Sequence, residues 1–117
     1  MAIDRKELIN RKYDESKECV GFEYELKIED EKGRIKTLPF YFNRLAERYW
    51  EVSMISKNKN FGELRAYSTE YEVPTKNMNL EVIAASGLRY IQYVIQSEVQ
   101  YKSMIDFCIG DCIASML

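Results

Sequence analysis

The sequence contains no histidine, and this absence removes the side chain that proteins use most often as a general base and as a metal ligand. Catalytic arrangements that pair histidine with a serine or cysteine nucleophile are therefore impossible within one chain. Glycine is also scarce: the five glycines stand singly, so the sequence has neither a phosphate-binding loop nor a GxGxxG motif. We expect a protein that is not an enzyme and uses no cofactor.

Cysteine is nearly absent too, with Cys19, Cys108 and Cys112 as the three examples. An odd number does not fit a disulfide framework, so free thiols in a reducing compartment are expected. Zinc takes about four ligands, and a redox pair is usually CxxC rather than the CxxxC found here. We therefore expect no metal site, and thiols that pack as small apolar side chains.

Long hydrophobic runs are missing as well. No apolar run approaches the roughly 20 residues that span a bilayer, and residues 1–17 are too polar for a secretory signal. A cytoplasmic protein with no membrane association is expected. The formal charge of −2 argues against general nucleic-acid binding, whose affinity comes mainly from neutralising phosphates.

The composition that remains is that of a globular protein, with 46% hydrophobic and 31% charged residues and nine tyrosines. We interpret residues 1–117 as a single domain. Asp4 and Glu7 have the spacing of a capping box and predict a short N-terminal helix. Residues 18–73 then alternate between apolar and polar side chains, which predicts four antiparallel strands with a hairpin turn at 30–33. The alternation of the second strand slips around Pro39, which predicts a bulge there, and the proline itself suggests an edge strand or a break.

The period becomes helical in residues 77–117, which hold only six of the 17 basic and 19 acidic residues. One apolar arc of the first helix contains Leu80, Ile83, Ala84, Leu88, Ile91, Val94 and Ile95. Glu98 would fall inside that arc, so we predict a break near Ser97 and a second helix. The predicted fold class is α+β, with a four-stranded antiparallel meander preceded by a short N-terminal helix and followed by two C-terminal helices.

The two helices carry more apolar surface than one sheet face can cover. We therefore expect a homo-oligomer that forms through the last helix, with Ile105, Cys108, Ile109, Cys112 and Met116 in the contact. Small residues would allow helices to approach closely, namely Ala84, Ala85, Gly87, Gly110 and Ala114. The alternative is a monomer in which the last helix is central.

Three groups of residues are candidates for ligand binding. The first is the polar face of the first long helix, where one arginine lies among amides and a phenol and suits a nucleotide or phosphate: Arg89, Gln92, Tyr93 and Gln96, with Ser86 nearby. The second could stack a base and hold a phosphate: Arg44, Arg48 and Tyr49, with Trp50. The third is Arg65 and Tyr67. The alternative for each group is an ordinary solvated or core position, and the Glu23 and Glu25 pair is expected to be a solvated strand face.

We expect a non-catalytic, oligomeric binding protein that acts as an inhibitor, immunity or sequestering factor, of the kind that phages or mobile elements encode. Its target would be a partner protein or a small anionic ligand. The order of elements resembles that of small phage proteins that sequester nucleotide immune signals, which implies cyclic nucleotides bound between subunits. It is also similar to single-stranded nucleic-acid-binding dimers built on a meander followed by helices. Both resemblances concern the fold alone.

Overall fold

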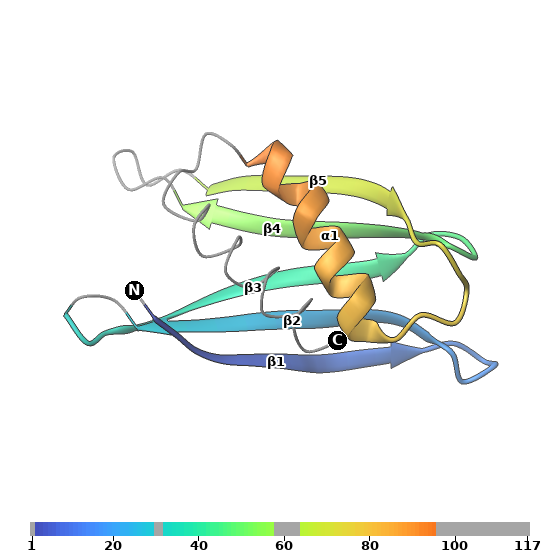
Figure 1. Ribbon diagram of the computed structural model, residues 1–117, viewed down its shortest axis with the longest axis horizontal. Helices are drawn as coiled ribbons and strands as arrows, with labels where there is room; N and C mark the ends of the chain where they lie inside the picture. Colours follow the sequence, from blue (N-terminus) through green and yellow to red (C-terminus); the bar gives the residue numbers. More distant parts are fainter. Residues whose placement is uncertain (1, 30–31, 58–63, 96–117) are drawn as a thin grey trace.

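The computed structural model describes residues 2–29, 32–57 and 64–95, which form a five-stranded antiparallel sheet and one helix (Figure 1). The strands lie side by side in the order in which they occur along the chain. Their bounds are β1 (Ala2–Tyr13), β2 (Cys19–Glu29), β3 (Ile35–Arg44), β4 (Tyr49–Lys57) and β5 (Leu64–Glu72), and the helix is α1 (Leu80–Val94). The α+β class and the antiparallel meander predicted for residues 18–73 are confirmed.

The predicted N-terminal helix is wrong, because residues 2–13 form the edge strand β1. Ile3 lies opposite Ile28 and Leu8 lies opposite Tyr24, although an odd number of steps separates Ile3 from Leu8. A register shift between Ile3 and Arg5 supplies the extra residue that makes this possible. The shift hides the two-residue period, so the sequence shows a helix cap and no strand. A ladder to β2 then stabilises the segment more than an isolated helix of this length could.

The bulge predicted at Pro39 is also wrong. The ladder between β2 and β3 runs without a shift from the Gly21–Asn43 pair to the Glu29–Ile35 pair. The expected edge position is nevertheless present, because the β3–β4 ladder begins only at Tyr41. Pro39 therefore occupies a part of β3 that has no ladder partner on its β4 side, where the missing N–H costs no hydrogen bond.

Helix α1 follows the predicted helical period. The side chain of Asn79 accepts a hydrogen bond from the N–H of Val82 at 2.9 Å and caps the N-terminus. Five of the seven residues predicted for the buried face are buried; Leu80 is half-buried and packs against the core, and Val94, the last residue of the helix, is exposed. Among the described residues one helix follows the sheet, where the sequence predicted two, and the residues of the predicted second helix, 101–116, lie outside this part of the chain.

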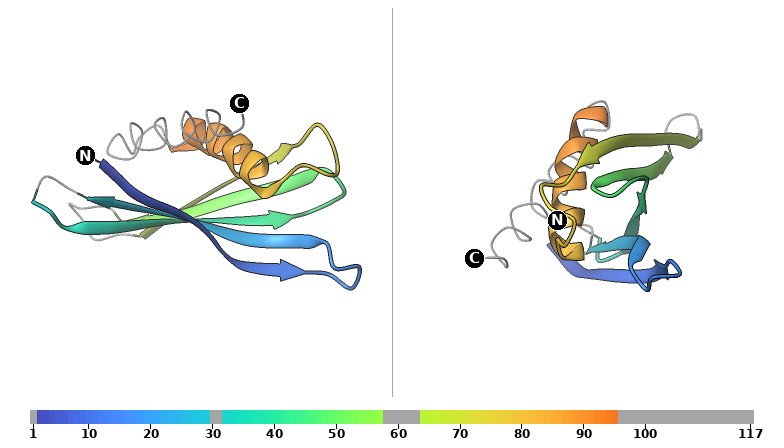
Figure 2. Two further views of the ribbon diagram at one scale, coloured as in Figure 1. Left: turned by 60° about the horizontal axis from the view of Figure 1, so that its bottom comes forward. Right: turned by 90° about the vertical axis from the view of Figure 1, so that its right-hand side faces the viewer.

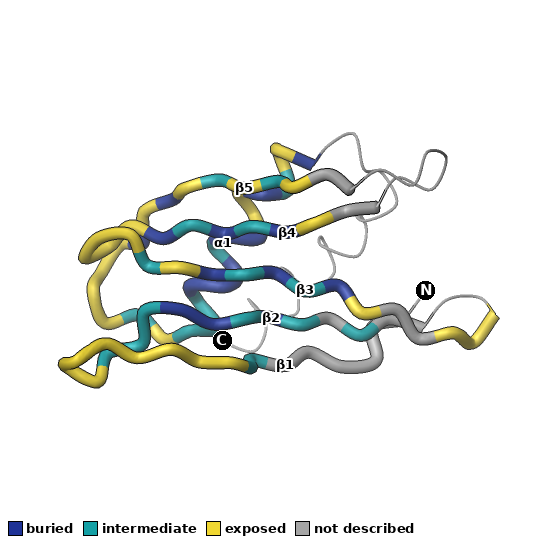
Figure 3. Tube along the Cα trace, turned by 180° about the vertical axis from the view of Figure 1, so that it is seen from behind, coloured by how far each residue is buried: buried dark blue, intermediate teal, exposed yellow. Residues whose placement is uncertain are grey.

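We call the face of the sheet that carries α1 the inner face and the opposite one the outer face. The sheet curves around the helix (Figure 2), which packs mainly on β5 and β4. Buried positions gather along the middle of the sheet, while the hairpin between β1 and β2 is exposed (Figure 3). The core contains aromatic side chains from four strands, β2 to β5, namely Phe22, Tyr24, Phe40, Phe42, Trp50 and Tyr71. No helix among the described residues has the length and apolar composition needed to cross a membrane.

Small residues bring α1 close to the sheet. Ala84, Ala85 and Gly87 are buried within the single chain. A Cβ atom at Gly87 would lie 2.6 Å from Phe42 Cε1 and 2.8 Å from Tyr71 Oη. These residues, which we expected to serve contacts between helices, therefore serve the packing of a helix on a sheet.

Candidate functional site

A hollow of about 410 Å³ lies between the end of β5 and the exposed face of α1. The helix contributes Ser86, Arg89, Tyr90 and Tyr93, whose spacing of three and four residues places them on one face. Glu72, at the end of β5, and Pro74 form the facing wall. We call this the α1–β5 hollow. It contains two residues of the first predicted group, Arg89 and Tyr93, together with Ser86.

Tyr90 is held by the buried ring behind it. Its ring stacks on that of Tyr71, with a centroid distance of 5.7 Å and an interplanar angle of 22°. The hydroxyl of Tyr71 donates a hydrogen bond of 2.8 Å to the carbonyl of Ile83, and burial raises the pKa of this phenol well above its ordinary value. Tyr71 is therefore a neutral structural donor that fixes the wall of the hollow, while Tyr90 remains 49% exposed.

The facing wall is fixed by Arg48, which belongs to the second predicted group. Its guanidinium pairs with the carboxylate of Glu72 and donates to the carbonyl of Pro74 at 3.0 Å. Its own carbonyl accepts a hydrogen bond of 2.9 Å from the N–H of Val73. Arg48 thus fastens the β3–β4 turn to the end of β5, and its charge is already matched by that of Glu72.

Arg89 has a different environment, because it makes no hydrogen bond or ion pair with any residue that the structure describes. It is exposed and lines the hollow together with Ser86 and Tyr93 of the same helix face. The two arginines near the hollow therefore differ in function. Arg48 neutralises a carboxylate of the protein, whereas the five N–H donors of Arg89 are not used by any residue in the described part of the chain.

The structure does not bring the second predicted group together. Tyr49 and Trp50 are consecutive in β4, so they point to opposite faces: Tyr49 is 48% exposed on the outer face and Trp50 is buried. Arg44 lies at the inner side near Trp50, where it donates to the carboxylate of Glu18 at 2.8 Å and to the carbonyls of Ala46 and Glu47. Arg44 is a brace of the turn, and its donors are occupied.

The remaining candidates are scattered. Tyr67 and Gln92 are half-buried and each makes a polar or aromatic interaction, and Tyr67 packs against the core. The side chain of Arg65 and all of Gln96 lie outside the part of the chain that the structure describes. The described members of the three groups thus yield one hollow with an available cation. Within the same residues no three carboxylates or thiols gather in a way that would hold a metal ion.

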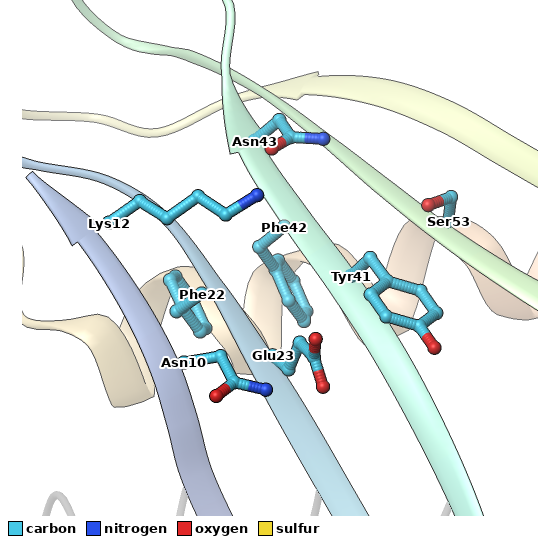
Figure 4. Close-up of a pocket in the computed structure, with 8 residues that line it drawn as sticks. All are labelled: Asn10, Lys12, Phe22, Glu23, Tyr41, Phe42, Asn43 and Ser53. Atoms are coloured by element: carbon cyan, nitrogen blue, oxygen red, sulfur yellow. The ribbon is translucent and has the colours of Figure 1, made fainter.

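A second hollow, of about 290 Å³, lies on the outer face and was not predicted from the sequence (Figure 4). Six polar side chains from β1 to β4 surround it: Asn10, Lys12, Glu23, Tyr41, Asn43 and Ser53. We call it the outer-face hollow. Gly21 pairs with two of these residues, Lys12 and Asn43, on the neighbouring strands. A lone glycine inside a strand pattern was the available signal, since such glycines often mark a close approach or a bulge.

Comparison of the chain with protein-family models, with curated proteins and with solved structures finds no match in any of the three. The geometry of the hollows is therefore the basis for inferring a function.

Proposed function

We propose that this chain is a non-catalytic binding protein that holds a small anionic ligand with an aromatic ring, such as a nucleotide, in the α1–β5 hollow. The observation that carries the proposal is the position of Arg89, a cation without a partner among the described residues, beside the rings of Tyr90 and Tyr93. A guanidinium forms paired hydrogen bonds with phosphate oxygens. A tyrosine ring stacks on a base and contributes about 1–3 kcal/mol for each stacked base.

The side chains of the hollow favour retention of a ligand over its conversion. Glu72 is the carboxylate among the lining residues, and Arg48 already engages it. The other polar groups there are a hydroxyl, two phenols and a guanidinium, which donate hydrogen bonds and stack at neutral pH. A protein that binds a nucleotide without changing it removes the nucleotide from circulation, so we propose a role as a sequestering or inhibitory factor.

Thermal melting against a panel of linear and cyclic nucleotides tests the proposal. A ligand that binds only the folded state stabilises it by about 2.7 kcal/mol at a concentration one hundred times its Kd. We expect Arg89→Ala to abolish the rise in Tm and Arg89→Lys to keep a small part of it, because an ammonium lacks the planar fork. Lys12→Ala, on the opposite face of the sheet, is the matched control and should keep the full rise. An unchanged rise in Arg89→Ala would refute the assignment of the hollow.

A partner protein is the second candidate, and the exposure of Tyr49 favours it. Tyr49 pairs with Glu72 in the register of β4 and β5, so exposed tyrosines near the end of β5 lie both on the outer face of the sheet, as Tyr49, and on α1, as Tyr90 and Tyr93. Tyrosine and arginine are enriched among the residues that dominate binding at protein interfaces. Under this proposal Tyr49→Ala weakens capture of the partner and leaves any nucleotide-induced rise in Tm intact. Under the ligand proposal Arg89→Ala abolishes the rise in Tm and leaves capture of a partner intact.

We also propose that the chain assembles as a homo-oligomer. The exposed Tyr93 and Val94 at the end of α1 support this, because they add apolar surface that solvent covers in a single chain. Light scattering coupled to size-exclusion chromatography measures the assembly directly. A mass of 13.9 kDa at micromolar concentration would identify a monomer and overturn this part of the proposal.

A further inference from the structure

The outer-face hollow depends on two local departures from a regular sheet. Asn10 has a φ of 51°, and β1 contains one residue more than β2 between the Ile9–Glu23 and Lys12–Gly21 pairs. A left-handed conformation at a residue other than glycine is uncommon, and such strain gathers at binding sites. Next to this bulge Gly21 allows the neighbouring side chains to approach closely, since a Cβ there would lie 3.3 Å from Asn43 Oδ1 and 3.6 Å from Lys12 Cβ. The bulge and the glycine thus set the positions of Asn10, Lys12 and Asn43, which line the hollow.

The charges around this hollow are not used within the described part of the chain. Lys12 and Glu23 lie on neighbouring strands and line the same hollow, but they form no ion pair with each other or with another described residue. Figure 4 shows the ammonium of Lys12 extended toward Asn43, while the carboxylate of Glu23 lies near Tyr41. Glu23 is half-buried, and a carboxylate that is partly removed from water is stabilised when a cation lies next to it.

The neutral groups of the hollow show the same lack of partners. Asn10, Asn43, Tyr41 and Ser53 make no side-chain hydrogen bond with a described residue. Elsewhere in this protein, polar side chains with structural roles are paired, as Asp14 is with two N–H groups of its turn. The hydrogen-bond donors and acceptors around the outer-face hollow, unused by described residues, therefore suit a ligand that has both acceptors and donors of its own.

We propose that the outer-face hollow binds a small zwitterion, an amino acid or a short peptide, with its ammonium on Glu23 and its carboxylate on Lys12. A phosphate-rich ligand is disfavoured here because the carboxylate of Glu23 repels it, and a simple cation or anion leaves one protein charge unmatched. The amides of Asn10 and Asn43 hydrogen-bond the charged ends, and Tyr41 and Ser53 contact the remainder. This site lies on the opposite face of the sheet from α1 and does not depend on the α1–β5 hollow.

Isothermal titration of the whole protein with single L-amino acids and with dipeptides tests the proposal and separates the two sources of a zwitterion. Two derivatives of the best ligand provide the chemical control: the N-acetyl form lacks the ammonium and the amide form lacks the carboxylate. We expect each derivative to bind about tenfold more weakly or worse, because each loses one charge-assisted hydrogen bond. If either derivative binds as tightly as the unmodified zwitterion, or if no zwitterion binds, the proposal is overturned.

Variants then locate the site. Lys12→Gln and Glu23→Gln should each weaken binding by about tenfold or more, and Lys12→Glu combined with Glu23→Lys should restore part of it. Glu25→Gln is the matched control, since Glu25 lies on the same face of β2 but pairs with Lys27 at 3.8 Å. Wild-type affinity in both single variants overturns the proposal. Arg89→Ala should leave zwitterion binding unchanged, so this result and the nucleotide result can fail separately.

Discussion

Replacement of Gly87 by alanine reverses the effect that helix propensity alone predicts. Alanine stabilises a helix interior by about 1 kcal/mol relative to glycine. In this structure, however, the new methyl group would lie 2.6 Å from Phe42 Cε1 and 2.9 Å from Tyr71 Cζ, distances that packed atoms do not adopt. Either ring must move or the helix must lift away from the sheet. Overpacking of this kind costs about 1–3 kcal/mol.

A second loss adds to the first, because Tyr71 cannot retreat without stretching its hydrogen bond to Ile83. A buried hydrogen bond of this type contributes about 0.5–1.5 kcal/mol. After the gain in propensity is subtracted, we expect Gly87→Ala to lower the free energy of unfolding by about 1–3 kcal/mol. For a chain of this size that corresponds to a fall in Tm of roughly 5–15 °C.

Urea denaturation followed by tryptophan fluorescence measures this loss. Trp50 is the single tryptophan of the chain and is 3% exposed in the core, so its emission reports unfolding directly. Ser86→Ala is the control, because it makes a similar change in propensity one residue away, at a half-buried position, and should not destabilise. A Gly87→Ala protein that is as stable as the wild type, or more stable, would refute the close approach of α1 to the sheet.

Two further predictions concern polar groups of the fold. Burial raises the pKa of Tyr71, so as the pH rises above about 10 this phenol loses its proton in the unfolded state before it does so in the folded state. The free energy of unfolding should then fall by up to about 1.4 kcal/mol for each further pH unit. Urea melts between pH 8 and 11 should show a shallower fall in Tyr71→Phe than in the wild type, and an equal fall in the two proteins would contradict the assignment. Arg44→Lys should lower the free energy of unfolding by about 1–2 kcal/mol, because an ammonium cannot reach Glu18 and the carbonyls of Ala46 and Glu47 at the same time. Urea denaturation measures this change, and a decrease below about 0.3 kcal/mol would show that only the positive charge matters at this position.

The sequence predicts regular parts of this fold well. β2, β4 and α1 each keep one period over most of their length. The alternation predicted for residues 18–73 therefore places Trp50, Val52 and Met54 on one face, and all three are buried. β1 could not be recognised, because its register shifts break the two-residue period that identifies a strand. The capping-box pattern at Asp4 was a real local preference that the pairing of strands overrides.

The candidate site was predicted in part for the same reason. Arg89, Tyr93 and Ser86 share a helix face, and this can be inferred from spacing alone. Their meeting with Glu72 requires the docking of α1 on β5, which no local pattern encodes. The occupied state of Arg44 could not be foreseen, since its carboxylate partner lies 26 residues earlier in the chain. The outer-face hollow combines four strands and a bulge, so it appears only in the assembled sheet.

The order of the strands has a consequence for the way this protein is made. Because the strands pair in sequence order, each ladder joins neighbouring segments, and the entropy lost in closing each loop is small. Successive hairpins can therefore form as the chain leaves the ribosome, before α1 has been synthesised. During that interval the aromatic inner face of the sheet lacks its helix and is open to other nascent chains. Translation speed through residues 73–95, rather than the intrinsic rate of strand pairing, then sets how long the protein is at risk of aggregation.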